Sequence, residues 1–168
     1  MKAEEAAEVI QFLEENGVEV YVDGGWAVDA VLGEQTREHE DLDVAVPEKD
    51  ALRLRKLLGE RGYRERLRDD TWECNFVLVD AQGREVDVHS FTLDESGKNV
   101  HGVPYAREHL TGNGFINDFA VRCVPPEWQV KFHTGYQLDR NDFRDVRALC
   151  ERFGIALPDE YLKEPENG

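Results

Sequence analysis

The sequence predicts an α+β protein in which one mixed β-sheet with flanking helices forms a single compact domain. Segments with helical hydrophobic spacing follow segments of alternating apolar residues along the chain. A strand, a glycine pair and a helix follow one another over residues 18–32. The 168 residues are 40% hydrophobic, enough for one core. We expect the central part at about residues 15–91, and a C-terminal part at about 92–162 that completes a pocket.

Hydrophobic periodicity and turn residues predict each element in order. Helices carry apolar residues at three- and four-residue spacing and end at glycines, whereas strands alternate apolar and polar residues. A turn-rich loop at 80–84 joins two alternating segments, which is typical of a hairpin. The predicted helices are 6–16, 26–32, 51 to about 60, 125–133 and 143–153, and the predicted strands are 18–22, 41–46, 63–67, 74–79, 85–91 and 119–124.

Charge and composition exclude several classes of function. The chain has 20 basic and 36 acidic residues, a net charge of −16. Such a surface disfavours binding to nucleic acid phosphates or to an anionic membrane, and it suits a small cationic partner.

Cysteine usage and the N-terminus indicate the compartment. The three cysteines, at 74, 123 and 150, form neither a disulfide framework nor a CxxC zinc pair, so we expect them to be buried in a reducing compartment. The acidic N-terminus is not a signal peptide, and no apolar run approaches the roughly 18 residues of a membrane span. These features predict a cytoplasmic protein.

Two aspartates on one strand carry the strongest functional signal. Asp41 and Asp43 share a strand face and lie within about 7 Å of each other. Aspartate is depleted in strands, and two like charges repel. A divalent cation such as Mg²⁺ offsets this repulsion, since it prefers oxygen ligands. The alternative is an edge strand that shows its acids to solvent.

A later strand repeats the pattern with Asp87 and His89 on one face. If the two strands are neighbours, three carboxylates converge, as in a two-metal site for phosphoryl or nucleotidyl transfer. Gly24 and Gly25 lie between a strand and a helix, where backbone N–H groups can approach phosphates. The alternative for this glycine pair is a simple tight turn.

The chain resembles the nucleotidyltransferase superfamily of the DNA polymerase β type in three segments. These are DGGWAVDAVLG, REHEDLDVAVP and GREVDVHSF. Trp26 replaces the usual serine after the glycines, and the spacer before Asp41 is long. In both departures this sequence is similar to the lincosamide nucleotidyltransferases. The resemblance to that group extends from about residue 5 to residue 162 of this chain. Aminoglycoside 2''-nucleotidyltransferases share part of the pattern. The resemblance implies a nucleotidyltransferase core at 15–91, Mg²⁺, transfer of AMP from ATP to an antibiotic hydroxyl with release of pyrophosphate, and a homodimer.

The resemblance assigns roles to the acidic residues. Asp41 and Asp43 hold the metals, and Asp87 completes the metal site. An acceptor hydroxyl needs a base within hydrogen-bond reach, and Asp87 and His89 are both candidates. The alternative for His89 is to orient a metal-bound Asp87.

Further residues are candidates for the phosphates and the acceptor. Arg37 and His39 precede Asp41 and could meet the triphosphate or pyrophosphate, or be solvated loop residues. Lys131 could reach the phosphates or pair with Glu127. The residues expected to line the acceptor or base pocket, or simply to pack, are Trp128, His133 and Tyr136. His101 and His109 show no neighbouring ligand pattern and are expected at the surface.

Two alternative functions remain at this stage. One is an aminoglycoside nucleotidyltransferase. The other is a catalytically inactive nucleotidyltransferase-fold regulator or antitoxin that acts by protein binding, which the intact set of Asp41, Asp43 and Asp87 disfavours.

Overall fold

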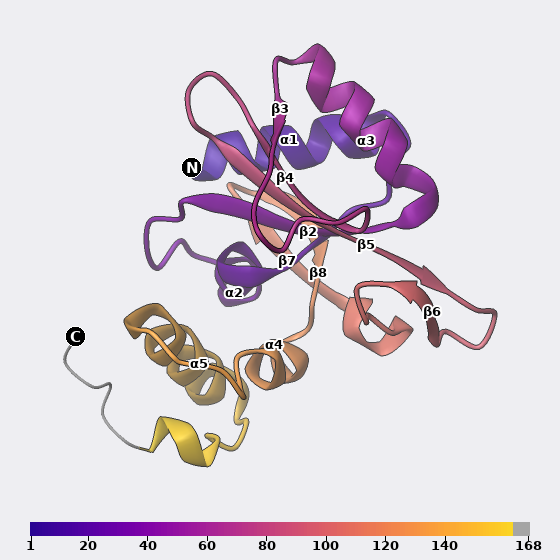
Figure 1. The fold of residues 1–168 in the computed structure, drawn as a ribbon. Helices are drawn as coiled ribbons and strands as arrows, with labels where there is room; N and C mark the ends of the chain where they lie inside the picture. The colour runs from indigo at the N-terminus through magenta and orange to yellow at the C-terminus, as the bar shows by residue number, and fades with distance from the viewer. Residues whose placement is uncertain (163–168) are drawn as a thin grey trace.

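Strands from both halves of the chain form one mixed sheet in the computed structural model, which describes residues 1–162 (Figure 1). The strands are β1 (Tyr21–Val22), β2 (Asp41–Pro47), β3 (Arg64–Arg66), β4 (Asn75–Val79), β5 (Glu85–Leu93), β6 (Asn99–Gly102), β7 (Gly112–Ile116) and β8 (Phe119–Cys123). The helices are α1 (Ala3–Glu15), α2 (Gly24–Leu32), α3 (Glu48–Glu60), α4 (Pro126–Phe132) and α5 (Arg140–Phe153), with 3₁₀ turns η1 (Arg107–Leu110) and η2 (Asp159–Tyr161). The predicted α+β class is confirmed.

Strand order places β2 and β5 at the centre. The order is β3-β4-β5-β2-β1-β8-β7, and β6 extends the sheet from the end of β5. The β2–β5 pair is parallel, and α3 and the β3–β4 hairpin lie between its strands in the chain. This pairing sets the second acidic strand directly beside the first, as a three-carboxylate site requires.

One face of β2 and β5 is apolar and packs against α1 and α3. Val44 and Val88 are fully buried there, and Leu54 and Leu58 of α3 belong to the same cluster. Figure 1 shows α1 and α3 on this side of the sheet and α4 and α5 on the far side. The alternation of side chains along each strand therefore turns the acidic residues to the face opposite α1 and α3.

Helix ends are set by their flanking residues. Asp23 caps α2 by accepting a hydrogen bond from Gly24 N at 2.8 Å, and Asp139 caps α5 through the N–H groups of Asn141 and Asp142. Gly33 and Gly154 follow these two helices in the left-handed conformation. The glycine stops read from the sequence at 33 and 154 are confirmed.

The structure differs from the predicted elements at three places. The first strand pairs only at Tyr21–Val22, because Glu19 N donates to the Asp50 side chain rather than to a neighbouring strand. The strands β6 and β7 were not predicted. In β7, two glycines interrupt the apolar alternation, although Asn117 and Asp118, both at positive φ, turn β7 into β8.

In the described part of the chain, no helix has both the length and the apolar character needed to cross a lipid bilayer. The cysteines at 74, 123 and 150 are all buried and free, as predicted.

Candidate active site

The parallel register brings the two acidic strands together at one level of the sheet. Asp43 on β2 lies directly opposite Asp87 on β5, and Asp41 lies opposite Glu85. Asp43, Asp87 and His89 each present a ligand atom within 4.8 Å of the others. Asp41 stands two residues earlier on the same face of β2. Three carboxylates and an imidazole therefore gather on the polar face of the sheet.

The glycine pair lies directly against these groups. A Cβ on Gly24 would lie 2.2 Å from Asp43 Oδ2, and Gly24 adopts a φ of +58°. A Cβ on Gly25 would lie 2.3 Å from Arg37 Nη2 and 2.5 Å from His39 Nδ1. A side chain at Gly24 would clash with Asp43, and one at Gly25 would displace Arg37 or His39, so the pair does more than make a turn: Gly24 lets the start of α2 approach the carboxylates.

Asp87 has two cationic neighbours. Arg68 Nη2 lies 2.8 Å from Asp87 Oδ2, and His89 Nε2 lies 3.3 Å from Asp87 Oδ1. The His89 contact is an ion pair whose geometry falls outside that of a hydrogen bond, so buried Oδ1 has no hydrogen-bond partner. An unpartnered carboxylate oxygen beside two further acids is an atom suited to bind a cation.

The acids differ in how their surroundings shift their pKa values. Burial, followed by the charge of Asp41, raises the pKa of Asp43 to about 8. Burial and the charge of Asp87 also raise the pKa of Asp41. For Asp87, burial alone would raise the pKa, but His89 and Arg68 hold it below its ordinary value. The site therefore stabilises only part of its negative charge, and a bound divalent cation would stabilise the rest.

His89 responds in the opposite sense to burial. Burial alone would lower the pKa of His89, but Asp87 and then Asp43 raise it above its ordinary value. Its other ring nitrogen, Nδ1, lies 3.4 Å from the Tyr105 hydroxyl. His89 thus connects the acidic group with the aromatic residues beyond it.

Tyr105, Asp23 and Arg68 are residues of the site that sequence reasoning missed. The Tyr105 hydroxyl donates to Asp23 Oδ2 at 2.5 Å, and its burial and Asp23 raise its pKa well above the ordinary value. Asp23 could have been predicted as a residue of the site, because it directly precedes the glycine pair in the sequence. Tyr105 and Arg68 come from a loop and an irregular segment whose position depends on tertiary structure.

An aromatic group extends from Tyr105 away from the carboxylates. Tyr105 lies 5.7 Å from Phe91 and 6.1 Å from Phe132 between ring centroids. Phe132 in turn contacts Trp128 and His109. Tyr105 and Phe132 line a cavity of about 210 Å³ together with Val103 and Pro104. His109 was expected as a surface residue, but its ring packs 4.2 Å from Trp128.

The predicted phosphate-binding residues have partners within the protein. Arg37 makes three hydrogen bonds to buried Asp145 of α5: Nε donates to Oδ1 at 3.3 Å and to Oδ2 at 3.1 Å, and Nη2 donates to Oδ2 at 2.9 Å. His39 is 4% exposed, its Nε2 lies 2.5 Å from Asp29 Oδ2, and its ring packs at a tilt against Trp26, 4.3 Å between ring centroids. Both side chains still border Gly25, which keeps them beside the first turn of α2.

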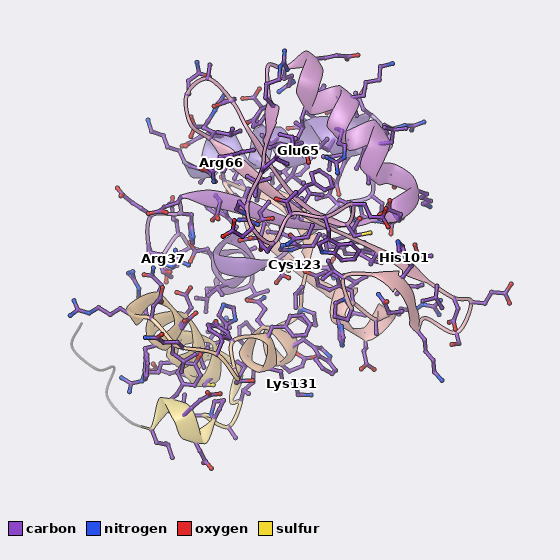
Figure 2. All side chains as sticks on the ribbon, viewed as in Figure 1. Arg37, Glu65, Arg66, His101, Cys123 and Lys131 are labelled. Atoms are coloured by element: carbon purple, nitrogen blue, oxygen red, sulfur yellow. The ribbon has the colours of Figure 1, made fainter. Side chains whose placement is uncertain are left out.

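The remaining candidates lie on and after α4. Lys131 is exposed, with Nζ 3.8 Å from the centroid of the Trp128 ring (Figure 2). His133 Nδ1 lies 2.7 Å from the Gln129 carbonyl oxygen, and the exposed Tyr136 hydroxyl donates to Asp142. Of this group, Trp128 belongs to the aromatic cluster at Tyr105, and Lys131 contacts that cluster through the Trp128 ring.

A family model described as aminoglycoside-2''-adenylyltransferase matches residues 5–149. A lincosamide resistance protein of Staphylococcus haemolyticus is 26% identical over 147 residues, covering 84% of this chain and 89% of the relative. A 2''-aminoglycoside nucleotidyltransferase of Klebsiella pneumoniae is 29% identical over 149 residues, covering 78% and 81%.

Solved structures share the fold. The lincomycin-bound lincosamide antibiotic adenylyltransferase LnuA superposes with a TM-score of 0.75 at 24% identity, covering 87% of this chain and 94% of that one. ANT(2'')-Ia in complex with adenylyl-2''-tobramycin gives 0.73 at 18% identity, with 90% and 89% covered. The resemblance read from the sequence is confirmed: the chain belongs to the aminoglycoside-2''-adenylyltransferase family of antibiotic nucleotidyltransferases and is related to the lincosamide nucleotidyltransferases.

Proposed function

We propose that the protein transfers AMP from ATP to a hydroxyl group of a lincosamide, releasing pyrophosphate, with Mg²⁺ as the metal. The observation that carries the proposal is the pairing of Asp43 with Asp87 across the parallel strands, with Asp41 on the same face. An arrangement of acids on neighbouring strands, bordered by a glycine-rich helix start, suits transfer of a nucleotidyl group.

Asp41, Asp43 and Asp87 would hold the metal. The raised pKa of Asp43 supports this assignment, and so does Asp87 Oδ1, which has no hydrogen-bond partner, because the protein stabilises neither carboxylate completely. Bound Mg²⁺ supplies positive charge that stabilises the attacking and leaving oxygens. Arg68, at 2.8 Å from Asp87 Oδ2, would lie beside the metal and could donate to a phosphate oxygen there.

The acceptor hydroxyl must lose its proton as it attacks the α-phosphorus. We assign this proton to Asp87 or His89, whose facing atoms lie 3.3 Å apart. A carboxylate that binds a metal is a weak base, because the metal stabilises its charged form. His89 is the better base if Asp87 is a full metal ligand, and otherwise it orients Asp87.

The triphosphate is proposed to lie at the start of α2. Gly24 lets the start of α2 lie against Asp43, and the first turn of a helix offers N–H groups and a partial positive charge. Arg37 and His39 border Gly25 and are proposed to support this region from behind. Lys131 is exposed and is proposed to reach the phosphates from α4.

The acceptor is proposed to bind over residues of the C-terminal part, from 92 to 162. The 210 Å³ cavity beside Tyr105 and Phe132 supports this, because Tyr105 also reaches His89. Trp128 belongs to the same aromatic group, and His133 and Tyr136 follow it in the chain. The net charge of −16 attracts an amine-bearing antibiotic.

A second candidate acceptor is an aminoglycoside. The matching family model is described by that substrate, and the Klebsiella pneumoniae relative is a 2''-aminoglycoside nucleotidyltransferase. The small apolar cavity at Tyr105 favours the lincosamide, because an aminoglycoside presents polar groups over most of its surface.

A substrate panel tests the proposal. With Mg²⁺ and ATP, we expect pyrophosphate release that depends on a lincosamide and exceeds the release with any aminoglycoside. Omitting the antibiotic is the matched control. Aminoglycoside-dependent turnover alone would transfer the assignment to the second candidate, and no turnover with either class would favour a regulator that acts by protein binding.

We also propose a homodimer, which the resemblance implies. The free edge strand β7 carries Phe115, which is 59% exposed and offers apolar surface for a second copy. At micromolar concentration, sedimentation velocity should show twice the chain mass of 19.3 kDa. A fully active monomer at that concentration would contradict this assembly.

A further inference from the structure

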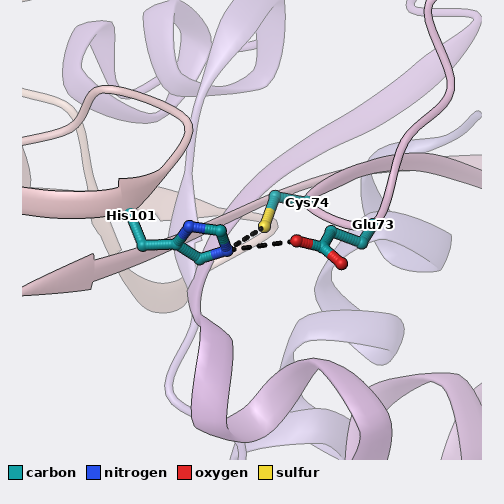
Figure 3. Close-up of side chains that lie close together, drawn as sticks. All are labelled: Glu73, Cys74 and His101. Carbon is teal, nitrogen blue, oxygen red and sulfur yellow. Dashed lines mark hydrogen bonds and ion pairs between the residues drawn. The ribbon is translucent and has the colours of Figure 1, made fainter.

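A second group of metal-ligating side chains lies away from the carboxylates. Glu73, Cys74 and His101 converge as shown in Figure 3. His101 Nε2 lies 3.5 Å from Cys74 Sγ and 3.3 Å from Glu73 Oε1. This cluster could not be predicted from the sequence, because no CxxC pair is present and His101 stands far from Cys74 in the chain.

These separations match the edges of a zinc coordination shell. Zinc binds sulfur at about 2.3 Å, and nitrogen and oxygen at about 2.0–2.2 Å. At tetrahedral angles, these bond lengths place two ligand atoms about 3.3–3.6 Å apart. Both contacts of His101 Nε2 fall in that range. The side chains need little rearrangement to receive one ion.

Local structure presents the three ligands from two separate elements. Trp72 and Asn75 form an isolated bridge, joined by hydrogen bonds of 2.9 and 3.0 Å, and Glu73 and Cys74 occupy the two-residue turn between them. His101 comes from β6, where it pairs with Thr92 of β5. Adjacent turn residues and a neighbouring strand form a rigid frame, which lowers the entropic cost of binding an ion.

The surroundings of the thiol also favour a cation. Cys74 is buried, and its thiol donates to Glu48 Oε2 at 3.3 Å. The Ser90 hydroxyl hydrogen-bonds to the same Glu48 oxygen. Glu48 therefore stands behind the thiol as an acceptor, and it adds negative charge beside the cluster. Both His101 and Glu73 are at least half exposed, which leaves an open path for an ion from solvent.

We propose that Cys74, His101 and Glu73 bind a zinc ion, with the fourth position open to water. A thiolate, an imidazole and a carboxylate form a donor set suited to Zn²⁺ and not to Mg²⁺, which selects oxygen ligands. The site shares no residue with the carboxylate group on β2 and β5. Its ion joins the turn at residues 72–75 to β6, and it does not depend on which antibiotic the enzyme modifies.

Cobalt binding to the full chain tests this site. Co²⁺ takes the place of Zn²⁺ in such sites, and a cobalt–thiolate bond produces a near-ultraviolet charge-transfer band that oxygen ligands do not give. When Co²⁺ is added to the metal-free protein, we expect this band to appear and to saturate at one Co²⁺ per chain. Adding Zn²⁺ should then abolish the band. The band separates this site from the group of Asp43, Asp87 and His89, which contains no thiol.

Variants locate the ion. Cys74→Ser should abolish the band, and His101→Gln, a change at a half-exposed side chain, should weaken Zn²⁺ binding at least about 100-fold, beyond the usual effect of losing an outer-shell partner. Cys123→Ser and Cys150→Ser are matched controls at the other two cysteines and should keep the band. Absence of a band in the parent protein, or a band that survives Cys74→Ser, would overturn the site and leave the three residues as a hydrogen-bonded cluster.

Discussion

Asp43→Asn should lower the rate of nucleotidyl transfer by at least about 10³-fold, which corresponds to about 4 kcal/mol of transition-state stabilisation. Asp43 faces Asp87 across the β2–β5 pair and touches the start of α2 at Gly24. Asparagine keeps the shape but removes the charged oxygen that the metal requires. Pyrophosphate release with Mg²⁺, ATP and the preferred antibiotic measures the loss.

Stability separates this loss from misfolding. Asp43 carries a pKa of about 8, raised from 3.8, so the folded protein holds a proton that the unfolded chain releases above about pH 4. The contribution of Asp43 to the stability of the metal-free parent therefore falls as pH rises from about 4 to 8, and Asp43→Asn should be the more stable protein at pH 9. Asp118→Asn, in the exposed β7–β8 turn, is the matched control and should keep full activity. A near-normal rate in Asp43→Asn would remove the metal assignment.

His89→Ala is expected to lower the rate by about 10²-fold or more and to remove the acidic limb of the pH–rate profile. His89 lies 3.3 Å from Asp87 and 3.4 Å from the Tyr105 hydroxyl, between the acids and the acceptor cavity. Because Asp87 and Asp43 outweigh burial and raise the pKa of His89, the limb of the parent should lie above the ordinary 6.5. A base works only when unprotonated, so activity should rise through that pH.

The result assigns the base. Loss of the limb with a large fall in rate supports His89, whereas an unchanged limb with a small fall assigns the proton to Asp87. His101→Ala is a matched control, because that histidine lies outside the carboxylate group and its loss should leave the limb in place.

Features that follow from the periodic spacing of apolar and polar residues could be predicted from the sequence. Features that depend on contacts between distant segments could not. The alternation around Asp41 and Asp43, and around Asp87 and His89, placed the acids on one face. The sequence did not predict that these two strands pair in parallel; their pairing had to be assumed, because strand order depends on the whole sheet.

The neighbours of the acids depend still more on tertiary structure. Arg68 reaches Asp87 from an irregular segment, and Tyr105 reaches His89 from the loop after β6. Neither residue lies in a segment with a regular hydrophobic pattern, so only the folded structure shows that both belong to the site. His39 illustrates the converse: its position before Asp41 suggested a phosphate ligand, but the fold buries it against Asp29 and Trp26.

The parallel β2–β5 pair also has a consequence for how the chain folds. Residues 48–84, which form α3 and the β3–β4 hairpin, separate β2 from β5 in the chain, and closing so long a connection is entropically costly. The step that closes it also sets Asp43 against Asp87 at one level of the sheet, where the two carboxylates repel each other when both are ionised. We therefore expect docking of β5 to limit the refolding rate, and divalent cations to accelerate it by screening that repulsion as the pair forms.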